Sequence, residues 1–312
     1  MQSVRTETGV EIAGFGAQVF PLVYRSLAGR TELLTAALGR LSRWDVDSGE
    51  LLNEFEVSEG GAGVVTGMAV VVMPDGRVRI ASGEEDGFSL WDGASGRLLV
   101  AADWDDQVFR ISGGVLEDDQ GLFVAGGPAG LYRWDAATGQ PLGPPLEHPG
   151  EVVTATLATL SGGTSLIATG DYEGVRRWRG SACELSFGEP IAADYVLLLT
   201  TAYMPDGRVL LVGAVGDGQA VRRWNAATGD EVGPLISTPE MVVGMTLAAV
   251  SGRMRLFTVD ESDTVRQWDL LTGAAVGQTF AGRAVSAVSS PDGSALLAVG
   301  TRDGKLATHQ LS

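Results

Sequence analysis

Carboxylates are the side chains of this sequence whose types and spacing could most readily do chemistry. They recur in short runs, and in two of these runs an aromatic residue, Trp104 or Tyr172, stands between them. Grouped carboxylates can hold Ca²⁺, act as general acid and base, or attract a cation, and an aromatic ring beside them adds a cation–π contact. The candidate binding residues are Glu84, Glu85, Asp86, Asp103, Trp104, Asp105, Asp106, Asp171, Tyr172, Glu173, Asp217, Asp260, Glu261, Asp263 and Asp303.

Nucleophilic and metal chemistry have little support. His148 and His309 are the only histidines and Cys183 is the only cysteine, so a multi-cysteine zinc site is excluded and a Ser-His-Asp triad would need one of these histidines. The carboxylates lack the spacing of an EF-hand loop. The glycine-rich stretches 60–63 and 126–127 open no helix that could bind a phosphate. We therefore expect no catalytic residue, no metal ligand and no cofactor, and we leave open whether the protein is an enzyme.

The charge and hydropathy of the chain limit its partners. The formal net charge of the 312 residues is −17, whereas a protein that binds nucleic acid needs a basic face. No stretch of about 18 uncharged apolar residues occurs, and the chain does not open with a basic segment followed by an apolar one. We expect a cytoplasmic protein that binds neither nucleic acid nor a membrane.

A short phrase built around tryptophan recurs along the whole chain. It reads LSRWDVDSG at residues 41–49 and LYRWDAATG at residues 131–139, and successive tryptophans lie 43 to 47 residues apart. A further step of 41 residues after Trp268 reaches His309, so the chain contains seven such repeats. The repeated tryptophans are Trp44, Trp91, Trp134, Trp178, Trp224 and Trp268.

Each repeat has the pattern of a series of short strands. Runs rich in valine, leucine and alanine are separated by turn signals, such as the Pro-Asp-Gly turns at residues 74–76, 205–207 and 291–293. No segment keeps a 3.6-residue apolar period, so we expect almost no helix. Four strands in a repeat of about 40–45 residues are typical of one blade of a β-propeller.

The Trp-Asp dipeptides and the turns that follow them resemble the WD-repeat family, and the resemblance covers essentially the whole chain. It implies an all-β fold in which residues 1–312 form a single domain, a seven-bladed β-propeller of four-stranded antiparallel blades. The chain ends soon after His309, so the last blade lacks an outer strand, and residues 6–12 match the segment that follows each Trp-Asp. We expect this N-terminal strand to pair with the strand near His309, complete the last blade and close the ring.

The sequence departs from the family in its polar side chains. The usual repeat links a histidine, a serine or threonine, an aspartate and the tryptophan by hydrogen bonds. Only the fourth repeat contains all four, as His148, Thr169, Asp171 and Trp178.

A second departure is a polar residue directly before the tryptophan. We favour a structural role in which these side chains pair with carboxylates of neighbouring blades, and we keep open a ring of arginines that lines a channel. The residues are Arg43, Arg133, Arg177, Arg223 and Gln267.

The expected topology gathers the acidic residues on one face. Turns between the second and third strands of a blade lie on the same face as the segments that link consecutive blades, and the candidate residues come from these two sets of loops. A strongly negative face attracts a basic partner. We therefore expect a non-catalytic interaction scaffold that binds a protein or peptide with a basic segment. Two alternatives remain open. The acidic face could be only a solvated rim, or the protein could be a small-molecule-binding or catalytic propeller that holds a cationic substrate or metal. The oligomeric state also remains open.

Overall fold

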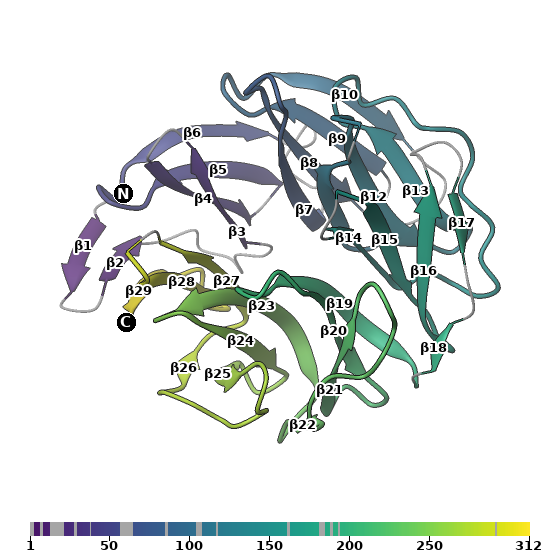
Figure 1. Cartoon of the computed structure of the whole chain (residues 1–312). Helices are drawn as coiled ribbons and strands as arrows, with labels where there is room; N and C mark the ends of the chain where they lie inside the picture. Colours follow the sequence, from purple (N-terminus) through teal and green to yellow (C-terminus); the bar gives the residue numbers. More distant parts are fainter. Residues whose placement is uncertain are drawn as a thin grey trace. The chain divides into compact units, whose positions relative to one another are not determined.

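The computed structural model describes residues 3–6, 9–12, 22–27, 30–37, 39–56, 65–84, 87–103, 108–116, 118–160, 163–180, 185–187, 190–192, 194–290 and 292–312. This part of the chain is all-β and contains no helix, as the sequence predicts. Its strands form seven small antiparallel sheets of three to five strands (Figure 1). The chain divides into two compact units: unit 1 comprises Met1–Val65 and Pro239–Ser312, and unit 2 comprises Thr66–Thr238.

Unit 2 contains four consecutive sheets. The first sheet consists of β7 (Val65–Val72), β8 (Val78–Glu84), β9 (Gly87–Asp92) and β10 (Leu98–Asp103). The second consists of β11 (Ile111–Val115), β12 (Gly121–Gly127) and β13 (Gly130–Asp135). The third consists of β14 (Thr154–Thr159), β15 (Ser165–Gly170), β16 (Gly174–Gly180), β17 (Leu185–Phe187) and β18 (Ile191–Ala192). The fourth sheet consists of β19 (Val196–Tyr203), β20 (Val209–Val215), β21 (Ala220–Asn225) and β22 (Ile236–Ser237).

Unit 1 contains three sheets. The first consists of β3 (Leu22–Leu27), β4 (Arg30–Ala37), β5 (Arg40–Asp45) and β6 (Leu51–Glu56), and the second of β23 (Val242–Val250), β24 (Arg253–Asp260), β25 (Thr264–Asp269) and β26 (Phe280–Ala281). The third has the order β1 (Ser3–Thr6), β2 (Gly9–Ile12), β29 (Leu306–Leu311), β28 (Ala295–Gly300) and β27 (Ala284–Ser289).

The N-terminal strand completes the last sheet, as the sequence predicts. Strand β2 pairs antiparallel with β29, with Glu11 opposite Ala307 and Ile12 opposite Leu306. Thr6, the first residue of the predicted segment, instead ends β1 and pairs with Gly9 of β2. Strand β1, which the sequence does not predict as a separate strand, adds a fifth strand beyond β2. The first and last segments of the chain therefore belong to one sheet of unit 1.

The repeated tryptophan marks one register position in every sheet. It lies on the third strand, opposite an apolar residue of the second strand, and His309 lies opposite Leu297 in the same way. The six other pairs are Leu33–Trp44, Ile80–Trp91, Phe123–Trp134, Ile167–Trp178, Leu211–Trp224 and Leu256–Trp268. The tryptophans are buried, so the repeat spacing reflects one core position per sheet.

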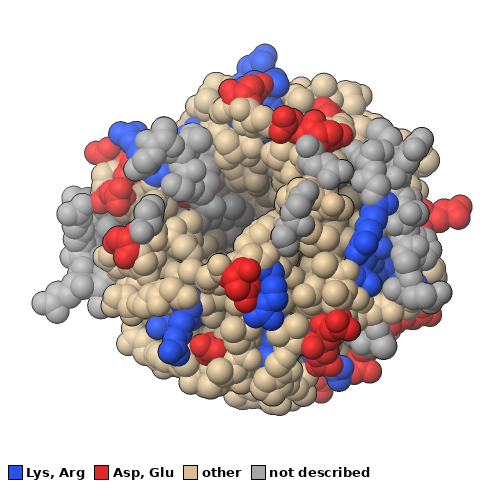
Figure 2. Space-filling view, in the orientation of Figure 1, with Lys and Arg blue, Asp and Glu red and all other residues tan. Residues whose placement is uncertain are grey.

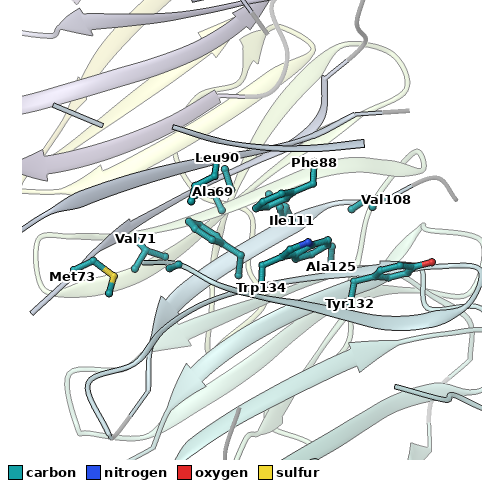
Figure 3. Packing of buried hydrophobic residues seen from close by; sticks show 13 residues of the cluster. Ala69, Val71, Met73, Phe88, Leu90, Val108, Ile111, Ala125, Tyr132 and Trp134 are labelled. Carbon is teal, nitrogen blue, oxygen red and sulfur yellow. The ribbon is translucent and has the colours of Figure 1, made fainter. Parts of the chain in front are cut away.

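Buried side chains fill the space between neighbouring sheets of a unit. Between the first two sheets of unit 2, Phe88 of β9 stacks on Trp134 of β13, with ring centroids 4.5 Å apart and planes 3° apart (Figure 3). Gly126 shows how closely the sheets approach each other, because a Cβ atom there would collide with the backbone carbonyl of Val152, in the segment that enters the third sheet. A side chain at this position would force the two segments apart.

Serine and threonine hydroxyls join the first strands of neighbouring sheets. In unit 2 the N–H of Leu199 in β19 donates to Thr154 Oγ1 in β14 over 3.2 Å, and the Thr201 hydroxyl donates to the Leu157 carbonyl over 3.0 Å. In unit 1 the N–H of Ala249 in β23 donates to Ser289 Oγ in β27 over 2.7 Å. These bonds satisfy polar groups where first strands lie side by side.

The aspartate that follows tryptophan builds the turn into the fourth strand. In unit 1, Asp269 Oδ1 accepts hydrogen bonds from the N–H of Thr272 over 2.8 Å and from its hydroxyl over 2.9 Å. Gly273, next in the chain, has a φ of 72°, which glycine adopts without steric cost. Asp45, Asp92 and Asp135 make the same pair of bonds to a Ser or Thr three residues later. Such local bonds explain why the phrase repeats.

The outer segments differ from the prediction of four strands in every blade. The sheet of β11–β13 has three strands, and only isolated bridges join Trp134 to Pro141 and Leu131 to Leu146. Prolines at 141, 144 and 145 lack the N–H that a continuous ladder requires. Prolines in the outer segment therefore prevent a regular fourth strand in this sheet.

The polar residue before tryptophan is structural where its contacts are described. Arg177 of β16 reaches the neighbouring sheet, as predicted, but donates there to the carbonyls of Ala226 and Ala227 over 3.3 and 2.8 Å rather than to a carboxylate.

The other described partners lie within the same repeat. Arg43 of β5 pairs with Glu32 of β4 in the same sheet over 3.0 Å, and both are buried. Arg133 and Gln267 donate to backbone carbonyls of the outer segment, those of Leu142 and Gln278. Arg133 and Gln267 therefore satisfy backbone carbonyls at places where the outer segment leaves the hydrogen-bonded ladder.

Candidate functional site

The four polar residues of the fourth repeat form the predicted network. Trp178 Nε1 donates to Thr169 Oγ1 over 2.9 Å, Thr169 Oγ1 lies 3.2 Å from His148 Nε2, and His148 Nδ1 lies 3.3 Å from Asp171 Oδ2. A neutral imidazole with its proton on Nδ1 satisfies this chain, because Nε2 then accepts from the threonine hydroxyl. Burial lowers the pKa of His148, and this effect exceeds the opposing attraction of the Asp171 carboxylate.

Asp171 holds the turn between β15 and β16. Its Oδ1 accepts hydrogen bonds from the N–H groups of Glu173 over 2.7 Å and Gly174 over 2.8 Å, and its Oδ2 lies 3.3 Å from Arg176 Nε. The residue is only 1% exposed. Although the sequence analysis places it in the binding set, its carboxylate is therefore directed into the fold and fixes the conformation of the turn.

Tyr172, on the same turn, is 56% exposed. Its ring stacks on that of Tyr195, with centroids 4.6 Å apart and planes 10° apart. Its hydroxyl donates to Glu151 Oε2 over 3.4 Å. Burial and the proximity of Tyr172 raise the pKa of Tyr195. We call Glu151, Tyr172, Glu173 and Tyr195 the Tyr172 site, together with Asp194, an exposed residue that directly precedes Tyr195 in the chain.

Three segments far apart in sequence position these side chains. Glu151 lies just before β14, Tyr172 lies between β15 and β16, and Tyr195 lies just before β19. The Val153 N–H donates to the Gly170 carbonyl over 3.0 Å, and the Val196 N–H donates to the Asp171 carbonyl over 2.9 Å. Backbone hydrogen bonds therefore hold the three segments together. At this place, the predicted proximity of second-to-third-strand turns and interblade segments is confirmed.

The corresponding place in unit 1 is also polar, but its carboxylates are paired. Asp260 is 2% exposed, accepts from the N–H groups of Ser262 and Thr264, and forms an ion pair with Arg266. Asp263 lies 3.3 Å from Arg283 and 2.6 Å from Arg302. Carboxylates that are already paired with arginines attract a further cation only weakly. This place therefore carries less unpaired negative charge than the sequence suggests.

The remaining candidate residues fall into two groups. Asp217, Glu261 and Asp303 are exposed; Asp217 accepts from the Gln219 N–H, and Asp303 pairs with Lys305 over 3.4 Å. The second group lies outside the described residues or has only its backbone described. Glu84 and Asp103 end β8 and β10, and both lie opposite Gly87. The predictions for their side chains stay predictions, as do those for Glu85, Asp86, Trp104, Asp105 and Asp106.

Charge and metal sites can be assessed over the described residues alone. On the face shown in Figure 2, Asp and Glu form small separate groups, several of them beside Lys or Arg. Within the described residues no group of three or more His, Cys, Asp and Glu side chains could hold a metal ion. No helix there is long and apolar enough to cross a membrane.

Tyr195 is a member of the site that is not among the candidate residues predicted from the sequence. A signal was present, because Asp194-Tyr195 and Asp103-Trp104 are both acidic–aromatic pairs in segments that link repeats. Comparison with known proteins found no protein-family model that matches the chain and no curated protein similar to it. The resemblance to WD repeats therefore rests on the residues themselves.

Proposed function

We propose that this chain is a closed seven-bladed β-propeller of the WD-repeat type and a non-catalytic interaction scaffold, which binds the basic segment of a protein or peptide at the Tyr172 site. Seven sheets with one equivalent tryptophan or histidine position each support the fold. The pairing of β2 with β29 supports closure by the N-terminal strand.

One observation carries the binding proposal: the exposed ring of Tyr172 lies against Tyr195 and beside the Glu151 carboxylate. An aromatic face next to a carboxylate attracts a cation by two effects, the ring quadrupole and the ionic charge. Contacts of this kind contribute about 0.5–2 kcal/mol, depending on how far the cation is desolvated.

The charges around the ring favour the same partner. Glu173 and Asp171 share Arg176, whose side chain is almost fully buried. Within the part of the chain that the structure describes, no lysine or arginine forms an ion pair with Glu151 or Asp194. Two carboxylates therefore remain available to a basic ligand, in a protein with a formal net charge of −17.

The salt dependence of binding tests this proposal. We expect a fluorescent peptide with four basic residues to bind the wild-type protein, with an affinity that falls as ionic strength rises. The double variant Glu151→Gln/Asp194→Asn removes two charges while keeping side-chain shape, and we expect it to bind more weakly and with less salt dependence.

The matched control is Asp118→Asn/Asp206→Asn. Both residues are exposed aspartates of unit 2 in turns between first and second strands, and an asparagine keeps the oxygen that accepts from a backbone N–H in each turn. Asp206→Asn also removes an exposed ion pair with Arg208, which contributes little to stability. This variant has the same net charge as the test variant. If the two variants lose affinity equally, the site is elsewhere and the effect is that of overall charge.

A further inference from the structure

The ring of Tyr172 offers one face to a ligand. Tyr195 stacks on the other face with nearly parallel planes, and over half of Tyr172 remains exposed. A flat aromatic face that is open on one side is a surface on which a planar cation can lie.

A carboxylate lies at the edge of this face. Because the Tyr172 hydroxyl donates to Glu151 Oε2, the carboxylate is located beside the hydroxyl end of the ring. A group that lies over that end of the ring comes within reach of Glu151. To use both contacts at once, the group must be flat and must carry N–H donors in its own plane.

We infer that the Tyr172 site takes the guanidinium group of an arginine in preference to the ammonium group of a lysine; this inference rests on the proposed function. The guanidinium group is planar, is weakly hydrated, stacks on aromatic rings and donates hydrogen bonds in its plane. The ammonium group is a compact, strongly hydrated charge. It loses more hydration when it lies over the ring, and it gains no stacking contact.

The site is held in place before a ligand arrives. Tyr195 is followed by Val196, whose N–H donates to the Asp171 carbonyl, and the Tyr195 carbonyl accepts from the Gly216 N–H over 2.7 Å. Asp171 in turn fixes the conformation of the residues that follow it. Because the site is already fixed, it loses little conformational entropy on binding. A difference in contact energy between the guanidinium and ammonium groups therefore appears as a difference in affinity.

Two peptides of equal charge test the inference. They share a glycine–serine backbone and carry either four arginines or four lysines, and binding is measured by fluorescence anisotropy at about 0.15 M salt, where exposed charges are screened. We expect the arginine peptide to bind the wild-type protein about fivefold more tightly or better. In Tyr172→Ala the difference is lost, whereas Tyr172→Phe retains most of it, because phenylalanine keeps the aromatic face.

The outcomes separate this inference from the proposed function. Equal affinities of the two peptides for the wild-type protein would overturn the preference for arginine and leave the binding of basic segments standing. Binding of neither peptide would overturn both. A preference that persists unchanged in Tyr172→Ala would place arginine recognition elsewhere and also overturn the inference. Circular dichroism of each variant confirms that it is folded.

Discussion

The imidazole of His148 lies 3.3 Å from the Asp171 carboxylate, and this contact joins two of the segments that build the Tyr172 site. His148 also lies 3.0 Å from the carbonyl oxygen of Gly150, directly before Glu151. Asp171 directly precedes Tyr172. The histidine is therefore a positioning residue, which holds the carboxylate and the ring in register without facing a ligand.

Stability should fall as the pH drops below about 6.5, the ordinary pKa of histidine. Burial lowers the pKa of His148 in the folded state; Asp171 and Glu173 oppose this shift, and Arg176 adds to it. A lowered folded-state pKa contributes stability above the unfolded value, and this contribution is lost as the pH falls through the folded value. Each titrating group contributes a slope of at most about 1.4 kcal/mol per pH unit.

Thermal unfolding at pH 7.5 and pH 5.5 checks this prediction. The wild-type protein should lose more stability between the two pH values than His148→Gln, which has no proton to gain at this position. Burial also lowers the pKa of His309, so the variant should keep part of the pH dependence. Identical losses in the two proteins would show that His148 does not titrate in this range.

The turns after tryptophan should depend more on the aspartate oxygen than on its charge. Asp269→Ala removes two hydrogen bonds to Thr272 and should cost about 1–2 kcal/mol of unfolding free energy. Asp269→Asn should cost much less, because Asn225 occupies the same place in another repeat and accepts from the Thr228 N–H over 3.1 Å. Urea unfolding of both variants measures the difference.

The Asp269 turn should also weaken in acid. The N–H and hydroxyl of Thr272 hold the pKa of Asp269 below its usual range. This contribution to stability is therefore present above pH 3.8 and is lost as the pH falls through the folded-state pKa. Urea midpoints for wild type and Asp269→Asn should converge below pH 3.8. A constant difference would contradict the assignment.

Gly126→Ala should be strongly destabilising, by about 1–3 kcal/mol or more. A Cβ atom at this position collides with the backbone carbonyl of Val152, which no side-chain rotation can relieve. Gly150→Ala is the control, since a Cβ atom there meets nothing within 4 Å. Chemical unfolding of the two variants should separate them clearly. Equal stabilities would mean that the segments around Gly126 and Val152 are further apart than the structure shows.

The buried pair of Arg43 and Glu32 should be costly to break on one side. Arg43→Met leaves the Glu32 carboxylate buried without its main partner and should cost about 3–5 kcal/mol. The double variant Arg43→Met/Glu32→Leu should recover much of this loss, because it leaves no buried charge. Unfolding free energies of both variants provide the comparison. A double variant as unstable as the single one would show that packing, not charge, dominates.

Several parts of the fold could be predicted from the sequence because each depends on short-range rules. The spacing of tryptophans reports one core position per sheet, and the step to His309 places that histidine opposite Leu297. The match of residues 6–12 to an outer strand predicts the pairing of β2 with β29. Both the register of the tryptophans and the pairing of the N-terminal strand can be predicted because they depend on repeat spacing and on local turn residues.

The site could be predicted only in part, since it depends on contacts that spacing does not encode. The acidic turn at Tyr172 stands out by composition, but its stacking on Tyr195 depends on how two consecutive sheets meet. Burial separates Asp171 and Asp260 from their exposed neighbours, although all are loop carboxylates in the sequence. The partner of an arginine before tryptophan lies on an adjacent strand, as Glu32 does for Arg43, or in the outer segment, as the Leu142 carbonyl does for Arg133. The repeat phrase includes neither.

The binding of an arginine-containing peptide to Tyr172→Ala and Tyr203→Ala tests the central claim most directly. Both tyrosines belong to unit 2 and are 56% and 54% exposed, but Tyr203 ends β19, whereas Tyr195 and the site lie at its beginning. We predict that Tyr172→Ala lowers the affinity about 5- to 30-fold and that Tyr203→Ala leaves it within about twofold. Equal affinities for the two variants would contradict the assignment of the binding site.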